Sequence, residues 1–278
     1  YSLTGDLDAS EYGIQIAGNF SYKNIVVRNG SINRFHTGLY LQRVSLSRFD
    51  NLSLTTNRYG LYLTAATGQS NGNRFTDCRI SDSLAMGIYV FAWNASQCNG
   101  NSFARCTITR NAGSGVYFLT QDSSQCDGNL FSDCRVYGNS MQGIVLGGPG
   151  SQSGNLISDC TISDNGYSGV YFNGQNGKCD GNSLFNCVMR KNGGKGVSCE
   201  STVGNRIEGN VISDSTGSPS YGIQTTMSSN NLVVRNICSG QTSNFDLGAN
   251  DTYGPIVEAN GALATNGVSA HPWANFSR

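Results

Sequence analysis

The stretch Asn101-Ser-Phe-Ala-Arg-Cys106-Thr-Ile-Thr-Arg-Asn111-Ala-Gly-Ser-Gly115-Val-Tyr-Phe118 is followed by a second copy, Asn129-Leu-Phe-Ser-Asp-Cys134-Arg-Val-Tyr-Gly-Asn139-Ser-Met-Gln-Gly143-Ile-Val-Leu146. Its ending, a glycine before an apolar–x–apolar triplet, recurs along the chain every 22 to 28 residues. A fixed period of this length is typical of a stacked solenoid. The triplet glycines are Gly13, Gly38, Gly60, Gly87, Gly115, Gly143, Gly169, Gly196 and Gly222.

Each copy contains three short apolar pieces separated by polar corners. No piece keeps a helical period over three turns, whereas alternation over three to five residues is common. We therefore predict an all-β fold, a single parallel β-helix of about ten coils with three short strands each. Such coils stack about 4.8 Å apart. We expect residues 1–250 to form the β-helix and residues 251–278 to form a C-terminal capping tail.

Two runs, Asn205-Arg-Ile-Glu-Gly-Asn210-Val-Ile212 and Asn231-Leu-Val-Val-Arg-Asn236-Ile237, carry a family resemblance. They resemble the coils of the right-handed parallel β-helix superfamily, which includes pectate-lyase-like and NosD-like repeat proteins. The tail, Asn250-Asp-Thr-Tyr-Gly-Pro-Ile-Val257 with His271-Pro-Trp-Ala-Asn-Phe276, looks like the ending of uncharacterised secreted bacterial β-helix proteins. The resemblance covers roughly residues 10 to 250 and implies the fold and export. It implies no single activity, because this fold hosts lyases, hydrolases, epimerases and non-enzymes.

The composition narrows the classes of partner. Charged residues make up 13% of the chain, with 18 Lys and Arg against 18 Asp and Glu. This balance gives no electrostatic case for nucleic acid or an anionic membrane. No apolar run approaches the length of a membrane span. The chain starts at Tyr1 without Met, so we expect a mature or trimmed, secreted form, extracellular or on the cell surface.

Half of the ten cysteines occupy one repeat position on successive coils. A small thiol packs well at an inward corner, so we expect a buried ladder of free thiols that two asparagines continue. We do not expect a metal there, since a one-dimensional column does not supply tetrahedral geometry. The predicted ladder is Cys78, Cys106, Cys134, Cys160, Cys187, Asn210 and Asn236.

Three other cysteines, Cys98, Cys126 and Cys179, lie in the corner that precedes the next coil. Cys98 and Cys126 are on adjacent coils, within reach of a disulfide. Cys179 lies two coils beyond Cys126, roughly 10 Å away by stacking, which is too far to bridge. Both a Cys98–Cys126 disulfide and free thiols remain open at this stage.

Carboxylates provide weak candidates for chemistry. Asp133 and Asp159 precede ladder cysteines on adjacent coils with no cation between them, a closeness that raises one pKa or attracts a cation such as Ca²⁺. Asp122 lies in a loop beside the tyrosines. Asp127 and Asp180 lie in Asp-Gly-Asn corners. We interpret them as turn residues, and Ca²⁺ ligation is the second interpretation. No confident metal site and no other cofactor is predicted.

The middle position of the triplet faces outward by strand alternation. It is most often tyrosine, and the strand that begins at Ile88 adds two further outward aromatic residues. Exposed aromatic strips usually mark interaction sites, and flat rings with a polar edge suit sugars. A subunit interface and stacking that only stabilises the sheet are the alternatives. This aromatic column is Tyr40, Tyr62, Tyr89, Phe91, Trp93, Tyr117 and Tyr171.

We therefore predict an extracellular protein that contacts a polysaccharide or cell-surface glycan through the aromatic column. Whether it is an enzyme stays open, with a polysaccharide lyase or a glycoside hydrolase as the expected class if it is one. The Asp-Pro-His-Glu run of C5-epimerase-like sites is absent. The alternative is a structural or filament protein, a homo-oligomer that self-associates through the column or through open coil ends.

Overall fold

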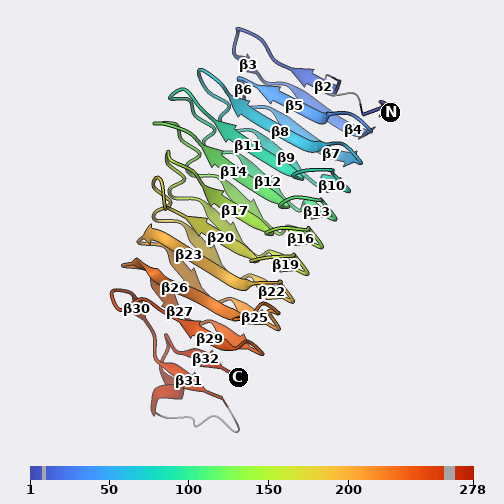
Figure 1. Ribbon diagram of the computed structural model, residues 1–278. Helices are drawn as coiled ribbons and strands as arrows, with labels where there is room; N and C mark the ends of the chain where they lie inside the picture. The colour runs from blue at the N-terminus through green and yellow to red at the C-terminus, as the bar shows by residue number, and fades with distance from the viewer. Residues whose placement is uncertain (8–10, 260–266) are drawn as a thin grey trace.

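The computed structural model describes residues 1–7, 11–259 and 267–278. The chain winds into a rod whose coils stack from the N-terminal to the C-terminal end (Figure 1). Parallel pairing joins each strand to the equivalent strand of the next coil. The predicted parallel β-helix with three short strands per coil is therefore confirmed.

One face of the rod is a ten-stranded parallel sheet with one strand per coil. Ten strands span nine full turns, close to the predicted count of about ten coils. The strands, in order, are β2 (Tyr12–Ile16), β5 (Thr37–Gln42), β8 (Tyr59–Ala65), β11 (Ile88–Ala92), β14 (Val116–Thr120), β17 (Ile144–Gly147), β20 (Val170–Asn173), β23 (Lys195–Val203), β26 (Tyr221–Ser229) and β29 (Ser243–Asp246).

The other faces belong to a twenty-stranded sheet, to which most coils give two short strands. Its first column is β9 (Arg74–Thr76), β12 (Ser102–Ala104), β15 (Leu130–Ser132), β18 (Leu156–Ser158), β21 (Ser183–Phe185), β24 (Arg206–Glu208), β27 (Leu232–Val234) and β30 (Thr252–Tyr253). Its second column is β10 (Arg79–Ser81), β13 (Thr107–Thr109), β16 (Arg135–Tyr137), β19 (Thr161–Ser163), β22 (Val188–Arg190), β25 (Val211–Ser213), β28 (Ile237–Ser239) and β32 (Asn275–Ser277).

The first coils are built differently. The long strands β4 (Val26–Asn33) and β7 (Arg48–Thr55) each run along both columns, and β7 pairs with both β9 and β10. The short strand β1 (Ser2–Thr4) pairs with β4. A separate two-stranded sheet joins β3 (Tyr22–Lys23) to β6 (Val44–Ser45).

Between the two columns the chain turns through two residues, of which the first adopts a left-handed conformation. The backbone φ is 55° at Asp77, 53° at Arg105 and 55° at both Asp133 and Asp159. Left-handed φ favours Asn and Asp, whose short side chains bond locally. The turn thus explains why Asp77, Asp133 and Asp159 precede ladder cysteines, and their side chains are exposed. It does not explain Arg105.

The triplet holds the core together. Its outer positions are buried, as at Val90 and Phe118, and the register aligns these residues coil by coil. A β carbon on Gly115 would lie 2.8 Å from the carbonyl oxygen of Gly143, so the glycine is required by the approach of the next coil. Inside the core, the rings of Phe75, Phe103 and Phe131 stack on one another. The centroids of Phe75 and Phe103 are 4.8 Å apart, and those of Phe103 and Phe131 are 4.6 Å apart.

Buried asparagines line the inner corners. Asn101 Nδ2 donates to Oδ1 of Asn129, whose own Nδ2 donates to Asn155. Each Oδ1 also accepts from the backbone amide of the preceding coil. Buried polar groups need such partners, so these ladders help to fix the stacking register.

The last coil continues into the C-terminal segment. β30 pairs with β27, while β32 pairs with both β28 and β31 (Ile256–Glu258). The short 3-10 helix η1 (Gly267–Ala270) precedes β32. Phe276 pairs with Ile237, whereas Trp273 stays 43% exposed and packs against the guanidinium of Arg235 at 4.3 Å. The division at residue 250 stays a prediction.

Candidate functional site

Aromatic side chains meet ring to ring along the outer face of the ten-stranded sheet. The Tyr40 and Tyr62 centroids are 5.4 Å apart, and those of Tyr62 and Tyr89 are 4.9 Å apart. Tyr117 follows at 6.0 Å from Tyr89. Adjacent coils therefore present their rings as a continuous row, because the register aligns the triplets.

Further aromatic rings flank the row of tyrosines. Phe91 stacks on Tyr89 at 5.7 Å and on Trp93 at 6.4 Å, and Trp93 is 37% exposed. The strand starts contribute rings that the sequence analysis did not select. Tyr12 lies 4.9 Å from Tyr40, and Tyr59 lies 5.8 Å from Tyr89.

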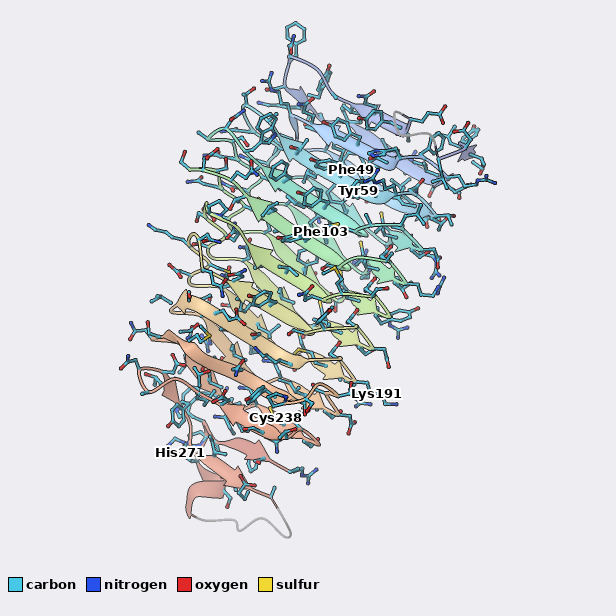
Figure 2. All side chains as sticks on the ribbon, in the orientation of Figure 1. Phe49, Tyr59, Phe103, Lys191, Cys238 and His271 are labelled. Carbon is cyan, nitrogen blue, oxygen red and sulfur yellow. The ribbon has the colours of Figure 1, made fainter. Side chains whose placement is uncertain are left out.

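These contacts define what we call the aromatic surface. Its members are Tyr12, His36, Tyr40, Tyr59, Tyr62, Tyr89, Phe91, Trp93 and Tyr117. The missed members lie two or more residues before a triplet, and their aromatic character was the available signal. Figure 2 labels Tyr59 on the upper coils.

The tyrosines are half-buried by their neighbours. Burial raises the pKa of Tyr62 above the ordinary value of 10.0, and the surrounding tyrosines Tyr89, Tyr40, Tyr59 and Tyr12 raise it further. Burial, followed by the nearby Arg58, lowers the pKa of His36. At neutral pH the aromatic surface therefore presents phenol groups and an uncharged imidazole.

The predicted outward column is interrupted at two positions. Val145 is 6% exposed and Ser198 is 1% exposed, although both are middle positions of their triplets. Val145 is paired between Tyr117 and Tyr171, whose larger rings screen it. Ser198 is covered because Lys195 Nζ donates to its hydroxyl at 3.3 Å.

Beyond Val145 the face becomes polar. The Tyr171 hydroxyl donates to Glu200 Oε2 at 2.6 Å, and Gln175 Nε2 donates to the same oxygen at 3.0 Å. Lys195 Nζ lies 3.5 Å from Glu200 Oε1. Burial first, then the Glu200 carboxylate, raises the pKa of Tyr171. Sequence analysis missed Lys195 and Glu200, which flank the triplet at Gly196.

These groups line a polar pocket of about 260 Å³. Its walls come from β20, β23 and the turns before the neighbouring strands. The residues are Gln142, Tyr167, Ser168, Tyr171, Gly194, Lys195, Ser198, Glu200 and Pro219.

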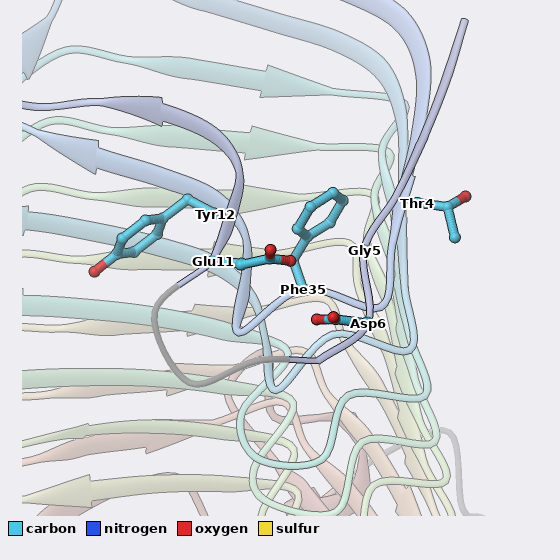
Figure 3. Close-up of a pocket in the computed structure, with 6 residues that line it drawn as sticks. All are labelled: Thr4, Gly5, Asp6, Glu11, Tyr12 and Phe35. Atoms are coloured by element: carbon cyan, nitrogen blue, oxygen red, sulfur yellow. The ribbon is translucent and has the colours of Figure 1, made fainter.

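A second pocket, of about 540 Å³, lies at the N-terminal end of the aromatic surface. Figure 3 shows its lining, with the Asp6 and Glu11 carboxylates near Phe35 and with Tyr12 on the adjoining strand. The aromatic surface therefore runs from this acidic pocket towards the polar pocket.

The carboxylates proposed from sequence do not join this site. Asp133 and Asp159 are exposed at the corner between the two columns of the twenty-stranded sheet. Asp159 accepts a 2.6 Å hydrogen bond from Asn186, and Arg105 pairs with Asp77 at 2.8 Å. Asp122 is exposed on a turn after β14. The positions of Asp133, Asp159 and Asp122 do not test whether these residues have a catalytic role.

The Asp-Gly-Asn corners act in turns. Asp127 Oδ1 accepts from the Ser153 amide at 2.7 Å and from the Ser151 hydroxyl at 2.8 Å. Asp180 Oδ1 accepts from the Val203 amide at 2.9 Å. These bonds agree with a turn role, and Ca²⁺ binding stays a prediction.

All ten cysteines are buried and carry free thiols. Thiols at the predicted ladder position point to the previous coil, as where Cys134 donates to the carbonyl of Phe103 at 3.4 Å. The side-chain Oδ1 of Asn210, at the same position, accepts from the backbone amide of Cys187 at 2.9 Å. No disulfide joins Cys98 to Cys126 in this structure. Burial raises the pKa of the Cys199 thiol to about 12.

Within the described part of the chain, no group of three or more His, Cys, Asp or Glu side chains could hold a metal ion. The two histidines are far apart along the rod, with His36 just before β5 and His271 beside the last coils (Figure 2). In the same residues no helix is long and apolar enough to cross a membrane.

A parallel β-helix with an aromatic outer face defines a class of protein, the right-handed β-helix solenoids. A family model for right-handed β-helix regions matches residues 4–131. The model described as periplasmic copper-binding protein (NosD) matches residues 95–254, more than half of the chain. The chain therefore belongs to the NosD family. A search of curated proteins found no match.

Solved structures show the same fold at low sequence identity. The mannuronan C-5 epimerase AlgE4 A-module of Azotobacter vinelandii superposes with a TM-score of 0.64 at 17% identity. That match covers 84% of this chain and 65% of the epimerase module, so this chain spans less than two thirds of it.

Two further enzymes are similar. The pectate lyase Pel9A has a TM-score of 0.65 at 17% identity, covering 90% of this chain and 68% of the lyase. The periplasmic alginate epimerase AlgG has a TM-score of 0.55 at 12% identity, covering 84% of this chain and 68% of the epimerase. These structural neighbours are polysaccharide-processing enzymes, and at this identity the likeness shows the fold alone.

Proposed function

We propose that this protein binds a polysaccharide along the outer face of its ten-stranded sheet. The observation that carries the proposal is the unbroken row of ring contacts from Tyr12 to Tyr117, widened by the 37% exposed Trp93. Exposed apolar surface of this kind is uncommon on monomers and marks a binding site. Aromatic rings offer a flat apolar face with a polar edge, which suits the CH faces and hydroxyls of sugars.

The geometry favours a chain-like ligand. The rings repeat once per coil, about 4.8 Å apart by sheet spacing, so a linear glycan can contact several coils at once. The polysaccharide enzymes that share the fold support this choice of ligand. Family membership and these neighbours also support a location outside the cytoplasm, either periplasmic or secreted.

Catalysis has weaker support than binding. A hydrolase needs two carboxyl groups that flank the scissile bond. Glu200 is the one carboxylate among the described residues that line the polar pocket, and Asp6 and Glu11 line the separate pocket at the N-terminal end. Asp133 and Asp159 are at a different corner of the rod. We therefore limit the proposal to glycan binding.

Copper binding is named in the family description, but the donor groups of the described residues do not fit it. Copper sites use imidazole and sulfur ligands that converge. The described residues bring no three His, Cys, Asp or Glu side chains together, and all ten thiols are buried. We assign no copper-dependent step to this chain.

Affinity gel electrophoresis against a panel of polysaccharides tests the proposal. Trp93→Ala and Tyr89→Ala should each weaken binding about fivefold, since one stacked aromatic ring contributes roughly 1 kcal/mol. Tyr137→Ala, on the twenty-stranded sheet, is the matched control and should bind normally. Equal binding by all three variants would place the glycan elsewhere.

Self-association through the same surface is the competing function. It predicts a multimer that persists on dilution and buries the tyrosines. Sedimentation of the wild type and of Trp93→Ala separates the two functions, because a glycan-binding monomer sediments identically in both forms.

A further inference from the structure

The polar pocket lies at the point where the aromatic surface ends. Tyr117, Val145 and Tyr171 are register partners on three successive coils, so the pocket continues the same outward row. Its next register position is Ser198, covered by Lys195. A glycan that follows the rings past Tyr117 would place a sugar residue over this pocket.

We propose that the polar pocket is a subsite for one uncharged sugar residue, bound by hydrogen bonds to its hydroxyl groups. This inference rests on the proposed function and adds the chemical class of the glycan, a neutral polysaccharide. Its volume of about 260 Å³ leaves room for a single ring that is partly open to solvent.

The pocket holds donors and acceptors in balance. Glu200 is an acceptor, Lys195 is a donor, and Ser198 and Gln142 serve as both. A sugar hydroxyl also donates and accepts, so this mixture suits it. Gln175 and Tyr171 hold the Glu200 carboxylate in place by bonds of 3.0 and 2.6 Å.

The charges in the pocket cancel. Lys195 Nζ is paired with Glu200 Oε1 at 3.5 Å, and their side chains are 25% and 20% exposed. Lys195 is the one basic residue among the described residues of the lining. A uronate carboxylate in this pocket would therefore face Glu200 without an unpaired cation to offset the repulsion.

The charges along the aromatic surface also favour a neutral glycan over a uronate polymer. Among the described residues, Arg58 is the basic side chain that packs against a ring of this surface, 5.9 Å from the centroid of Tyr59. The lowered pKa of His36 keeps that imidazole neutral. Asp6 and Glu11 add carboxylates at the N-terminal pocket. A uronate polymer such as pectate carries many negative charges and would find little attraction here.

The test compares neutral polysaccharides (a soluble β-glucan, a mannan and a galactan) with polygalacturonate and alginate, by affinity electrophoresis and calorimetry on the full chain. Wild type should bind at least one neutral polymer with little salt dependence, and should bind the uronate polymers at least tenfold more weakly. Glu200→Gln keeps the side-chain shape but frees the Lys195 charge. It should lose about tenfold in affinity for the neutral polymer and gain affinity for polygalacturonate at low salt.

Two controls keep the result interpretable. Asp159→Asn removes a carboxylate from a different corner and should change neither affinity, and thermal unfolding checks that each variant is folded. Lys195→Gln should also weaken neutral binding but should not gain polygalacturonate binding. Preference of the wild type for uronate polymers, lost on Trp93→Ala, would overturn the neutral class while keeping glycan binding. Absence of binding to every polymer would instead reject the proposed function itself.

Discussion

The hydroxyl of Tyr171 donates a 2.6 Å hydrogen bond to Oε2 of Glu200 on the next coil. The two residues are not register partners, since Tyr171 pairs with Ser198 and Asn173 pairs with Glu200. The bond therefore crosses the sheet diagonally and fixes the ring at the rim of the polar pocket. It also couples the charge of Glu200 to the protonation of Tyr171.

Replacing Glu200 should change the titration of Tyr171. Burial is the larger cause of the raised pKa and the carboxylate is the second, so Glu200→Gln should lower the pKa of Tyr171 towards, but not to, the ordinary tyrosine value. The phenolate absorbance measured against pH detects the shift, with Tyr171→Phe identifying the signal. Identical titration curves for wild type and Glu200→Gln would show that the two groups are not coupled in solution.

The aromatic surface and the polar pocket differ in how far the sequence could predict them. Tyr62, Tyr89 and Tyr117 stack because the triplet repeats with the same register, so alternation along one strand was enough to place them. The contact between Lys195 and Glu200 joins two residues five positions apart on the same strand, β23, and the repeat period does not predict it. Between β23 and β26 the pairing also shifts register after Ser198, and such irregularities redirect side chains.

Chemical labelling can count the accessible thiols. Every cysteine is buried and free, which keeps reagents away from the thiols. Burial also raises the pKa of Cys179 and Cys238, so the reactive thiolate is scarce at these two positions. We expect a thiol reagent to label almost no cysteine in the native protein and all 10 after denaturation without reductant. A count of eight after denaturation would reveal one disulfide, and Cys126→Ser would test whether it joins Cys98 to Cys126.

The ion pairs should contribute unequally to stability. Glu208 is 2% exposed and accepts hydrogen bonds from both Arg206 and Arg235. Arg235 in turn donates to the carbonyl of Pro272 at 2.9 Å. Glu208→Gln should lower the free energy of unfolding by about 2 kcal/mol, because hydrogen bonds to a buried charge are lost.

The exposed pair between Arg105 and Asp77 provides the contrast, since both side chains are more than half exposed. Surface ion pairs contribute little, so Asp77→Asn should leave the urea midpoint unchanged within error. A larger loss for Asp77→Asn than for Glu208→Gln would contradict this ranking. It would mean that the corner turn, where Asp77 has a φ of 55°, depends on the charge.

The tyrosines of the outer face should make the fold sensitive to alkali. Burial raises the pKa values of Tyr40, Tyr62, Tyr89 and Tyr117 above the ordinary 10.0. A group whose pKa is higher in the folded state contributes stability that is full below its unfolded pKa and is lost as pH rises through the folded value. The free energy of unfolding should therefore stay level up to pH 10 and fall above it, by less than about 1.4 kcal/mol per pH unit for each partly solvated tyrosine. The melting temperature should follow the same course.

Tyr62→Phe and Tyr89→Phe separate this effect from general alkaline damage. Each variant keeps the ring and its packing but removes one titrating hydroxyl, so the fall in melting temperature above pH 10 should become shallower and the neutral-pH value should change little. Tyr137→Phe, on the other sheet, should follow the wild-type curve. Parallel curves for all three variants would indicate that alkali acts elsewhere in the fold, because the row of tyrosines would then titrate without cost to stability.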